Sequence, residues 1–179
     1  MGDALSVSIS APELLTADHD LSLFDCGKAA LNDWLKTHAL NNQTKGFTRV
    51  LVVCEAGRVV GFYGVAPSAI PPSALSRSVR TGRPPDPVPC ILLGQFAVDK
   101  NFMGHGIGSA LLKDALGRCI AAASAIGGRA VIVRAIDKDA EAYWRSSGFI
   151  SAKDDPSTLF QSIENIAKWL AHIGIEIVL

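Results

Sequence analysis

Three glycines recur at alternate positions, Gly104, Gly106 and Gly108, between an apolar run and an amphipathic run of the chain. Glycine has no Cβ, so it leaves the backbone amides unshielded and adopts turn conformations that other residues avoid. A helix that begins directly after such a loop adds its first N–H groups and its positive dipole end. The spacing therefore predicts a corner that binds phosphate or pyrophosphate through backbone amides, without a basic side chain.

Two other phosphate-binding loops do not fit this sequence. No Gly-Lys-Ser/Thr closes the loop, so it is not a P-loop, and nucleotide hydrolysis is disfavoured. The Gly-x-Gly-x-Gly order also differs from the Gly-x-Gly-x-x-Gly spacing of dinucleotide-binding folds, and it stands late in the chain.

Hydrophobic periodicity predicts the elements that must position this loop. We expect a helix over 28–42, because Leu31, Trp34, Leu35, His38 and Ala39 fall at helical spacing. In the first half of the chain we also expect a short strand over 6–10, a hairpin of strands 49–55 and 59–65, and a proline- and arginine-rich loop over 66–90 with one helical turn from Pro71. In the second half we expect a strand over 91–98, a helix over 110–125, a strand over 130–136, a helix over 140–147 and a strand from Phe149. The last segment is either a strand over 159–163 or a final helix capped by Ser162, with Ile163, Ile166, Ala167, Leu170 and Ile173 on its core face. This order predicts an α/β (α+β) sandwich in a single domain over 1–179.

Composition limits the class of protein. The chain has 179 residues, of which 49% are hydrophobic, and no run is as long as a membrane span. The N-terminus lacks the pattern of a signal peptide, so we expect a cytoplasmic protein. Its four cysteines form no Cys-x-x-Cys motif, so we expect neither a metal site nor a disulfide framework.

Charge is unevenly distributed although the formal net charge is zero. Residues 28–100 hold nine Lys and Arg against four Asp and Glu, a local excess of five positive charges. Such a segment permits a polyanion-binding face but does not establish one, because an ordinary solvated surface has the same composition.

The glycine loop resembles motif A of the GNAT acyltransferases, (Gln/Arg)-x-x-Gly-x-(Gly/Ala), with Asn101 in the first place. The run Phe96-Ala97-Val98 is similar to the family's bulged strand that pairs with pantetheine, and 142–149 looks like its second coenzyme segment. The resemblance spans roughly residues 47–150. It implies a GNAT-like mixed central sheet with helices on both faces, with acetyl-CoA as acetyl donor. It also implies coenzyme contacts at Phe96, Ala97, Val98, Asn101, Gly104, His105, Gly106, Ile107, Gly108 and Ser109.

A narrower resemblance covers nearly the whole chain. The runs Leu23-Phe24-Asp25-Cys26-Gly27, Leu31 with Trp34-Leu35, Thr48-Arg49-Val50, Val88-Pro89 and Leu92-Leu93-Gly94 resemble the GNAT toxins of toxin–antitoxin pairs. That class acetylates the α-amino group of aminoacyl-tRNA, blocks translation, is usually dimeric and is silenced by a ribbon-helix-helix antitoxin. By this analogy the basic segment faces tRNA, and the residues assigned to it are Lys28, Lys36, Arg77, Arg80 and Arg83.

The sequence departs from the family at the catalytic position. Family members commonly place Tyr four residues before the glycine of a Gly-Phe pair, where it donates a proton to the leaving thiolate; here Trp144 precedes Gly148 at that distance. Tyr143 is the replacement candidate, but neighbouring residues on a helix point about 100° apart. Tyr143 is therefore either the proton donor or an aromatic residue that packs the helix, and an indole N–H cannot donate a proton.

The nucleophile bears on the choice of substrate. An α-amino group with a pKa of about 7.7–8.0 is already partly neutral at pH 7, whereas a lysine amine near 10.4 depends more on a base. The candidate bases Glu55, Asp99, Asp137 and His105 are each better explained as structural or solvated residues. Acetylation of an α-amine therefore depends less on a catalytic base than acetylation of a lysine amine does. A GNAT enzyme for a protein N-terminus or small amine and an inactive coenzyme-binding fold are the alternatives.

Overall fold

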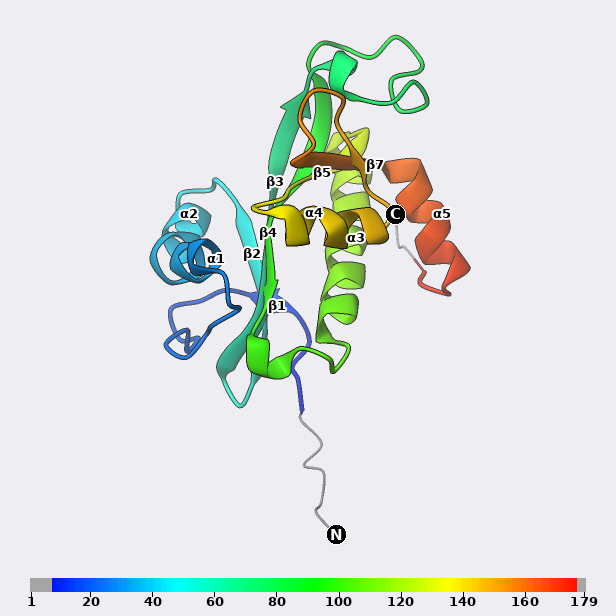
Figure 1. Ribbon diagram of the computed structural model, residues 1–179. Coiled ribbons are helices and arrows are strands. Elements are labelled where there is room, and N and C mark those ends of the chain that lie inside the picture. Colours follow the sequence, from blue (N-terminus) through cyan, green and yellow to red (C-terminus); the bar gives the residue numbers. More distant parts are fainter. Residues whose placement is uncertain (1–7, 177–179) are drawn as a thin grey trace. The chain divides into compact units, whose positions relative to one another are not determined.

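Seven strands form one mixed sheet in the computed structural model, which describes residues 8–176 (Figure 1). The strands follow one another in the order β1-β2-β3-β4-β5-β7-β6. Their bounds are β1 Glu13–Leu14, β2 Arg49–Glu55, β3 Arg58–Ile70, β4 Val88–Val98, β5 Ala130–Arg134, β6 Ile150–Ser151 and β7 Thr158–Ser162. β4 and β5 are parallel, whereas the β1–β2, β5–β7 and β6–β7 pairs are antiparallel. The mixed sheet and its helices confirm the expected α/β class.

Most of the helical segments fall where the hydrophobic patterns place them, whereas the short turn over 100–102 was not predicted. They are α1 Ala29–Asp33, the π-helix η1 Trp34–His38, α2 Ala39–Thr44, the 3-10 turns η2 Pro72–Ala74 and η3 Lys100–Phe102, and the helices α3 Ile107–Ile126, α4 Lys138–Ser146 and α5 Ile163–His172. Among residues 8–176, none of these helices has the length and apolarity that crossing a bilayer requires.

The chain divides into two compact units. One contains residues up to 64 together with 95–112, and the other contains 65–94 together with the residues from 113 onward. β3, β4 and α3 contribute residues to both units. The glycine loop belongs to the first unit, and α4 with its aromatic pair belongs to the second.

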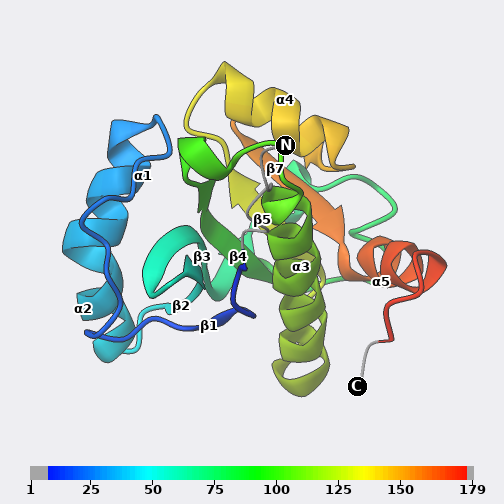
Figure 2. The ribbon, with the colours of Figure 1, turned by 90° about the horizontal axis from the view of Figure 1, so that it is seen from below.

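The first unit packs the helical stretch α1–η1–α2 against the apolar side of β2 and β3. Figure 2 shows these three segments following one another as one continuous helical stretch. Trp34 stacks on the buried ring of Phe62, with centroids 6.0 Å apart. The Ala39 N–H donates to the Trp34 carbonyl, which widens the turn and changes the residue spacing. Leu35 and Ala39 are therefore buried as predicted, whereas His38 is exposed.

The second unit centres on β5 and β7. Ile132 lies opposite Phe160 in their antiparallel register, and both side chains are buried in the core cluster. The two interpretations of the C-terminal segment are both confirmed, because Thr158–Ser162 is a strand and the Ser162 side chain then caps α5. Ile166 and Leu170 are buried, but Ile173 is 40% exposed, so its placement in the core was wrong. It lies just past the last residue of α5.

Several elements differ from the sequence-based expectation. β3 continues beyond Val65 to Ile70, because the fixed φ of Pro67 suits extended backbone and costs only one ladder donor. β1 was not predicted, since two residues carry no periodic signal. The strand expected over 6–10 lies partly outside the described residues, and within them Ile9 forms only an isolated bridge with Glu55.

Candidate functional site

The glycine loop has the backbone geometry that its sequence predicts. Gly104 and Gly106 have φ values of +80° and +79°, which side chains with a Cβ rarely adopt. A Cβ built at either position meets no atom within 4 Å, so both glycines border open space. α3 begins at Ile107, earlier than the expected start at Ala110, and Gly108 therefore lies in its first turn instead of in the loop.

The amides of this loop are available to a ligand. Among residues 8–176, no atom accepts a hydrogen bond from the backbone N–H groups of 104–109. The Ala110 N–H is the first in this stretch to be satisfied, by the Gly106 carbonyl at 3.1 Å. The open amides and the positive end of α3, a helix that runs from Ile107 to Ile126, form a cradle suited to a phosphate or pyrophosphate.

The strand that leads to the cradle leaves part of its backbone without a β5 partner. β4 and β5 pair through Leu93, opposite Val133, and no β5 pairing is found for the later residues of β4 within the described chain. Ala97 and Val98 are buried, and Phe96 is half-buried.

Asp99 and Asn101 connect β4 to the glycine loop. The Asp99 side chain is 0% exposed, and its Oδ1 accepts the Asn101 N–H at 2.9 Å. The side chain of Asn101 is exposed, as are His105 and Ser109. Because its carboxylate is buried and hydrogen-bonded, Asp99 is a structural residue and not a free base.

Tyr143 and Trp144 have different surroundings on α4. Trp144 is 6% exposed and its ring lies edge-on to Phe149, with centroids 5.2 Å apart. Tyr143 is 39% exposed, and burial of its hydroxyl raises the pKa of that group, partly offset by a hydrogen bond with Ser147. Trp144 is thus a packing residue, whereas Tyr143 has a phenol that stays protonated at neutral pH.

The five basic residues assigned to tRNA are divided between the two units. Lys36 is exposed and Lys28 is half-buried, and both belong to the first unit. Arg77 and Arg83 are exposed and Arg80 is half-buried, and these belong to the second unit. Each unit therefore displays its own cationic side chains.

Arg129 supports the arginine-rich loop and was missed in the sequence. Its Nε donates to the Val79 carbonyl at 2.9 Å, and its Nη2 donates to the Thr81 carbonyl. Val79 and Leu75 are buried in the core cluster of the second unit, so the loop is fixed from two sides. No local signal identifies Arg129, because its partner Val79 is 50 positions away in the chain.

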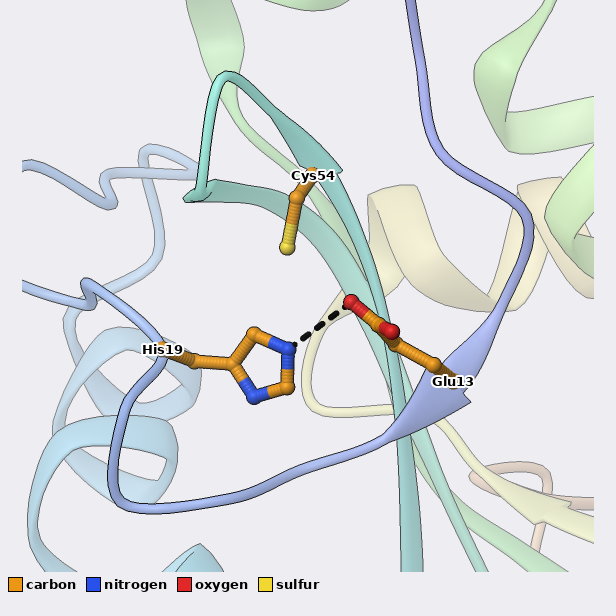
Figure 3. A group of neighbouring side chains, drawn as sticks. All are labelled: Glu13, His19 and Cys54. Atoms are coloured by element: carbon orange, nitrogen blue, oxygen red, sulfur yellow. Dashed lines mark hydrogen bonds and ion pairs between the residues drawn. The ribbon is translucent and has the colours of Figure 1, made fainter.

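Glu13, His19 and Cys54 form a cluster of metal-ligand types, with ligand atoms within 4.8 Å of one another (Figure 3). The Thr16 N–H donates to His19 Nδ1 at 2.9 Å, so a neutral ring carries its proton on Nε2. That Nε2 faces Glu13 Oε1 at 2.9 Å. Binding a metal through Nε2 would move the proton to Nδ1, opposite another donor, so the geometry favours a hydrogen-bonded pair over a metal site.

Comparison with known proteins identifies relatives over most of the chain. Residues 12–149 match the model of the Acetyltransferase (GNAT) family. A tRNA-acetylating toxin of Mycobacterium tuberculosis (strain ATCC 25618 / H37Rv) is 42% identical over 147 residues, which make up 82% of this chain and 88% of that protein.

Two solved structures show the same similarity in three dimensions. The structure of AtaT complexed with acetyl-methionyl-tRNAfMet is 29% identical, with a TM-score of 0.83, and the match covers 91% of this chain and 99% of that one. A Tyr-to-Phe mutant of the AtaT toxin, bound to the C-terminus of the antitoxin AtaR and to acetyl-CoA, is 28% identical, with a TM-score of 0.77, and covers 92% and 99% respectively.

Proposed function

Because this chain belongs to the GNAT acetyltransferase family and is an N-acetyltransferase, we propose that it acetylates the α-amino group of aminoacyl-tRNA and so inhibits translation. The similarity to a tRNA-acetylating toxin over most of the chain is the observation that carries this proposal. The acetyl donor is acetyl-CoA, which is also present in the AtaT mutant complex.

The glycine loop would hold the pyrophosphate of acetyl-CoA. Its open amides over 104–109 and the first turn of α3 supply donors without any cationic side chain. By the family resemblance, the pantetheine arm would lie along β4 at Phe96, Ala97 and Val98. The open amides and the family resemblance are what support this assignment of the coenzyme contacts.

The reaction needs positioning more than strong base catalysis. The neutral α-amine attacks the thioester carbonyl carbon, a C–N bond forms, and the C–S bond breaks with its electron pair on sulfur. The nitrogen becomes positively charged as the C–N bond forms, and it then loses a proton to water. The pKa of about 7.7–8.0 of the α-amino group matters before this step, because it leaves part of the amine neutral and able to attack near pH 7. In our proposal the thiolate takes a proton from Tyr143, whose raised pKa keeps the phenol protonated.

The basic side chains would hold the RNA backbone. Lys28, Lys36, Arg77, Arg80 and Arg83 offer charge without base-specific geometry, which suits phosphate contacts that position a nucleic acid. The anchoring of the arginine loop by Arg129 supports this assignment, because a fixed loop loses less conformational entropy on binding.

We further propose that the protein is a homodimer in the cytoplasm and is neutralised by a ribbon-helix-helix antitoxin. The complex of the related AtaT mutant with the antitoxin AtaR supports an antitoxin partner. The charged tRNA substrate is itself cytoplasmic, which supports that location.

Incubation with labelled acetyl-CoA and total aminoacyl-tRNA tests the proposal. We expect label on the aminoacyl group of tRNA. Label found only on a protein N-terminus or a small amine would show that this amine, and not aminoacyl-tRNA, is the substrate. Coenzyme binding without any transfer would indicate an inactive fold.

A matched pair of glycine variants links activity to the cradle. Gly106→Ala places a Cβ among the open amides at a φ of +79°, and we expect the KM for acetyl-CoA to rise about tenfold. Gly46→Ala carries the same backbone strain, at a φ of +80° and with open space around it, but lies away from the cradle in sequence. We expect its KM to stay at the wild-type value, and equal effects of the two variants would contradict the assignment.

A further inference from the structure

A buried carboxylate lies immediately before the glycine loop and has a donor at each oxygen. Asp99 Oδ1 accepts the Asn101 N–H at 2.9 Å. Its Oδ2 accepts the Asp25 N–H at 3.0 Å and Arg58 Nη2 at 3.3 Å. The Asp99 backbone is equally engaged, since its N–H donates to the Val60 carbonyl and its carbonyl accepts the Phe102 N–H. Every polar atom of Asp99 is therefore used to fix the exit of β4.

Asp25 supplies a second fastening of the same turn. Its backbone carbonyl accepts the Lys100 N–H at 2.8 Å, and its Oδ2 lies 2.8 Å from Lys100 Nζ. Its Oδ1 accepts the Gly27 N–H and Asn32 Nδ2, so the carboxylate is itself held in one orientation. Hydrogen bonding to Lys100, Gly27 and Asn32 lowers the pKa of Asp25 well below its usual range.

Phe102 completes this cluster. Its ring is buried, and the guanidinium carbon of Arg58 lies 5.4 Å from the ring centroid. Arg58 thus contacts both the first and the last residue of the turn 99–102. The turn is held by the side chains of Asp25 and Arg58, which come from two separate segments of the first unit.

Burying a carboxylate costs folding free energy unless the group is hydrogen-bonded, and well-packed apolar residues at the same place often give equal stability. Stability alone therefore does not explain a buried aspartate at this turn. We infer that Asp99 and Asp25 are positioning residues for acetyl-CoA, which fix the turn 99–102 so that the amides of 104–109 converge on the pyrophosphate. This inference rests on the proposed binding of acetyl-CoA at the glycine loop. It also gives a role to the Phe24-Asp25-Cys26-Gly27 run, to which sequence alone assigned none.

Electrostatics and positioning predict opposite effects when these carboxylates are neutralised. Removing a negative charge near an anion site strengthens anion binding if charge alone matters. Loss of positioning weakens it, because the side-chain NH₂ that Asp99→Asn introduces would face donors from Asp25, Asn101 or Arg58 in place of an acceptor.

The test is calorimetric binding of CoA to the full-length protein, together with the KM and kcat for acetyl-CoA. For Asp99→Asn we expect the Kd of CoA and the KM for acetyl-CoA to rise about tenfold, with kcat at saturation changed less than about threefold. Hydrogen exchange of the Asn101 and Phe102 amides, which donate to Asp99, should also accelerate. A CoA affinity equal to or tighter than that of the wild type would overturn the inference.

Asp25→Asn keeps the test decisive if Asp99→Asn does not fold, because the Asp25 side chain is 42% exposed. We expect its Kd for CoA to rise about threefold, and an unchanged or lowered Kd would overturn the inference. The control is Glu164→Gln, which neutralises an exposed carboxylate paired with Lys168 on α5 and should leave CoA binding unchanged. Failure of the wild-type protein to bind CoA would instead overturn the proposed function itself.

Discussion

Tyr143 and Trp144 are adjacent on α4 but cannot do the same chemistry. The indole of Trp144 is buried against Phe149 and has no proton to transfer, whereas the phenol of Tyr143 is partly exposed. The family position is therefore filled by a packing residue. If an acid assists departure of the thiolate, the neighbouring phenol is the group on α4 with suitable chemistry.

The variant Tyr143→Phe tests this role. We expect kcat to fall by about 10²–10⁴-fold, the usual contribution of a positioned general acid. The raised pKa of Tyr143 sets the sign of the pH effect: the wild-type rate falls at a pH above the ordinary tyrosine value of about 10, where the phenol loses its proton. That alkaline limb should be absent from the pH profile of Tyr143→Phe.

Trp144→Phe is the control for packing. It retains an aromatic contact with Phe149 and leaves the Tyr143 hydroxyl in place, so most of the activity should survive. An undiminished kcat in Tyr143→Phe would show that the thiolate leaves without a protein acid. Such a reaction is chemically feasible, because a thiolate whose thiol has a pKa of about 8.5 is a fair leaving group.

At the scale of elements, the arginine loop is a fixed structure. Leu75 and Val79 anchor it in the core, and Arg129, the residue before β5, donates to the carbonyls of Val79 and Thr81. Long loops in compact domains are usually functional or disordered, and these contacts favour function.

Substitution of Arg129 separates its anchoring from its charge. Arg129→Met removes both carbonyl contacts, and Arg129→Lys keeps the charge but loses the planar fork that reaches two acceptors. We expect both variants to raise the KM for aminoacyl-tRNA about tenfold while the KM for acetyl-CoA stays unchanged. Wild-type kinetics in Arg129→Lys would show that charge alone matters.

Arg83→Gln is the companion variant, and it should reduce the slope of log K against log salt by about 0.7–0.9 if Arg83 contacts one phosphate.

Local signals predicted the elements well, and long-range contacts were the part that they could not predict. The glycine spacing indicated the amide cradle, and the helix cap at Ser162 was readable because a cap and its helix are adjacent in sequence. The contact between Asp99 and Asp25 joins residues 74 positions apart, and neither residue type nor spacing identifies such a pair. The same holds for Arg129.

Across the whole molecule, the periodic patterns and the family motifs agreed on one fold. The order of strands in the sheet could not be read from the patterns, since parallel pairing of β4 with β5 joins segments separated by α3. β3 also continues beyond its expected end at residue 65 to Ile70. The proline content after residue 65 suggested a loop, but the backbone there stays extended. The mixed sheet was predicted from the resemblance to the GNAT family and not from the hydrophobic periodicity.

The proposed activity has a consequence for a cell that contains this protein. Induced expression of the wild-type chain should stop protein synthesis, because acetylated aminoacyl-tRNA no longer presents a nucleophilic amine. Incorporation of a labelled amino acid measures this directly. Gly106→Ala should slow the arrest, since its Cβ intrudes on the cradle at a φ of +79°, whereas Gly46→Ala should arrest synthesis as fast as the wild type. Coexpression of the cognate antitoxin should restore synthesis, and continued synthesis with the active wild-type enzyme present would contradict a toxin.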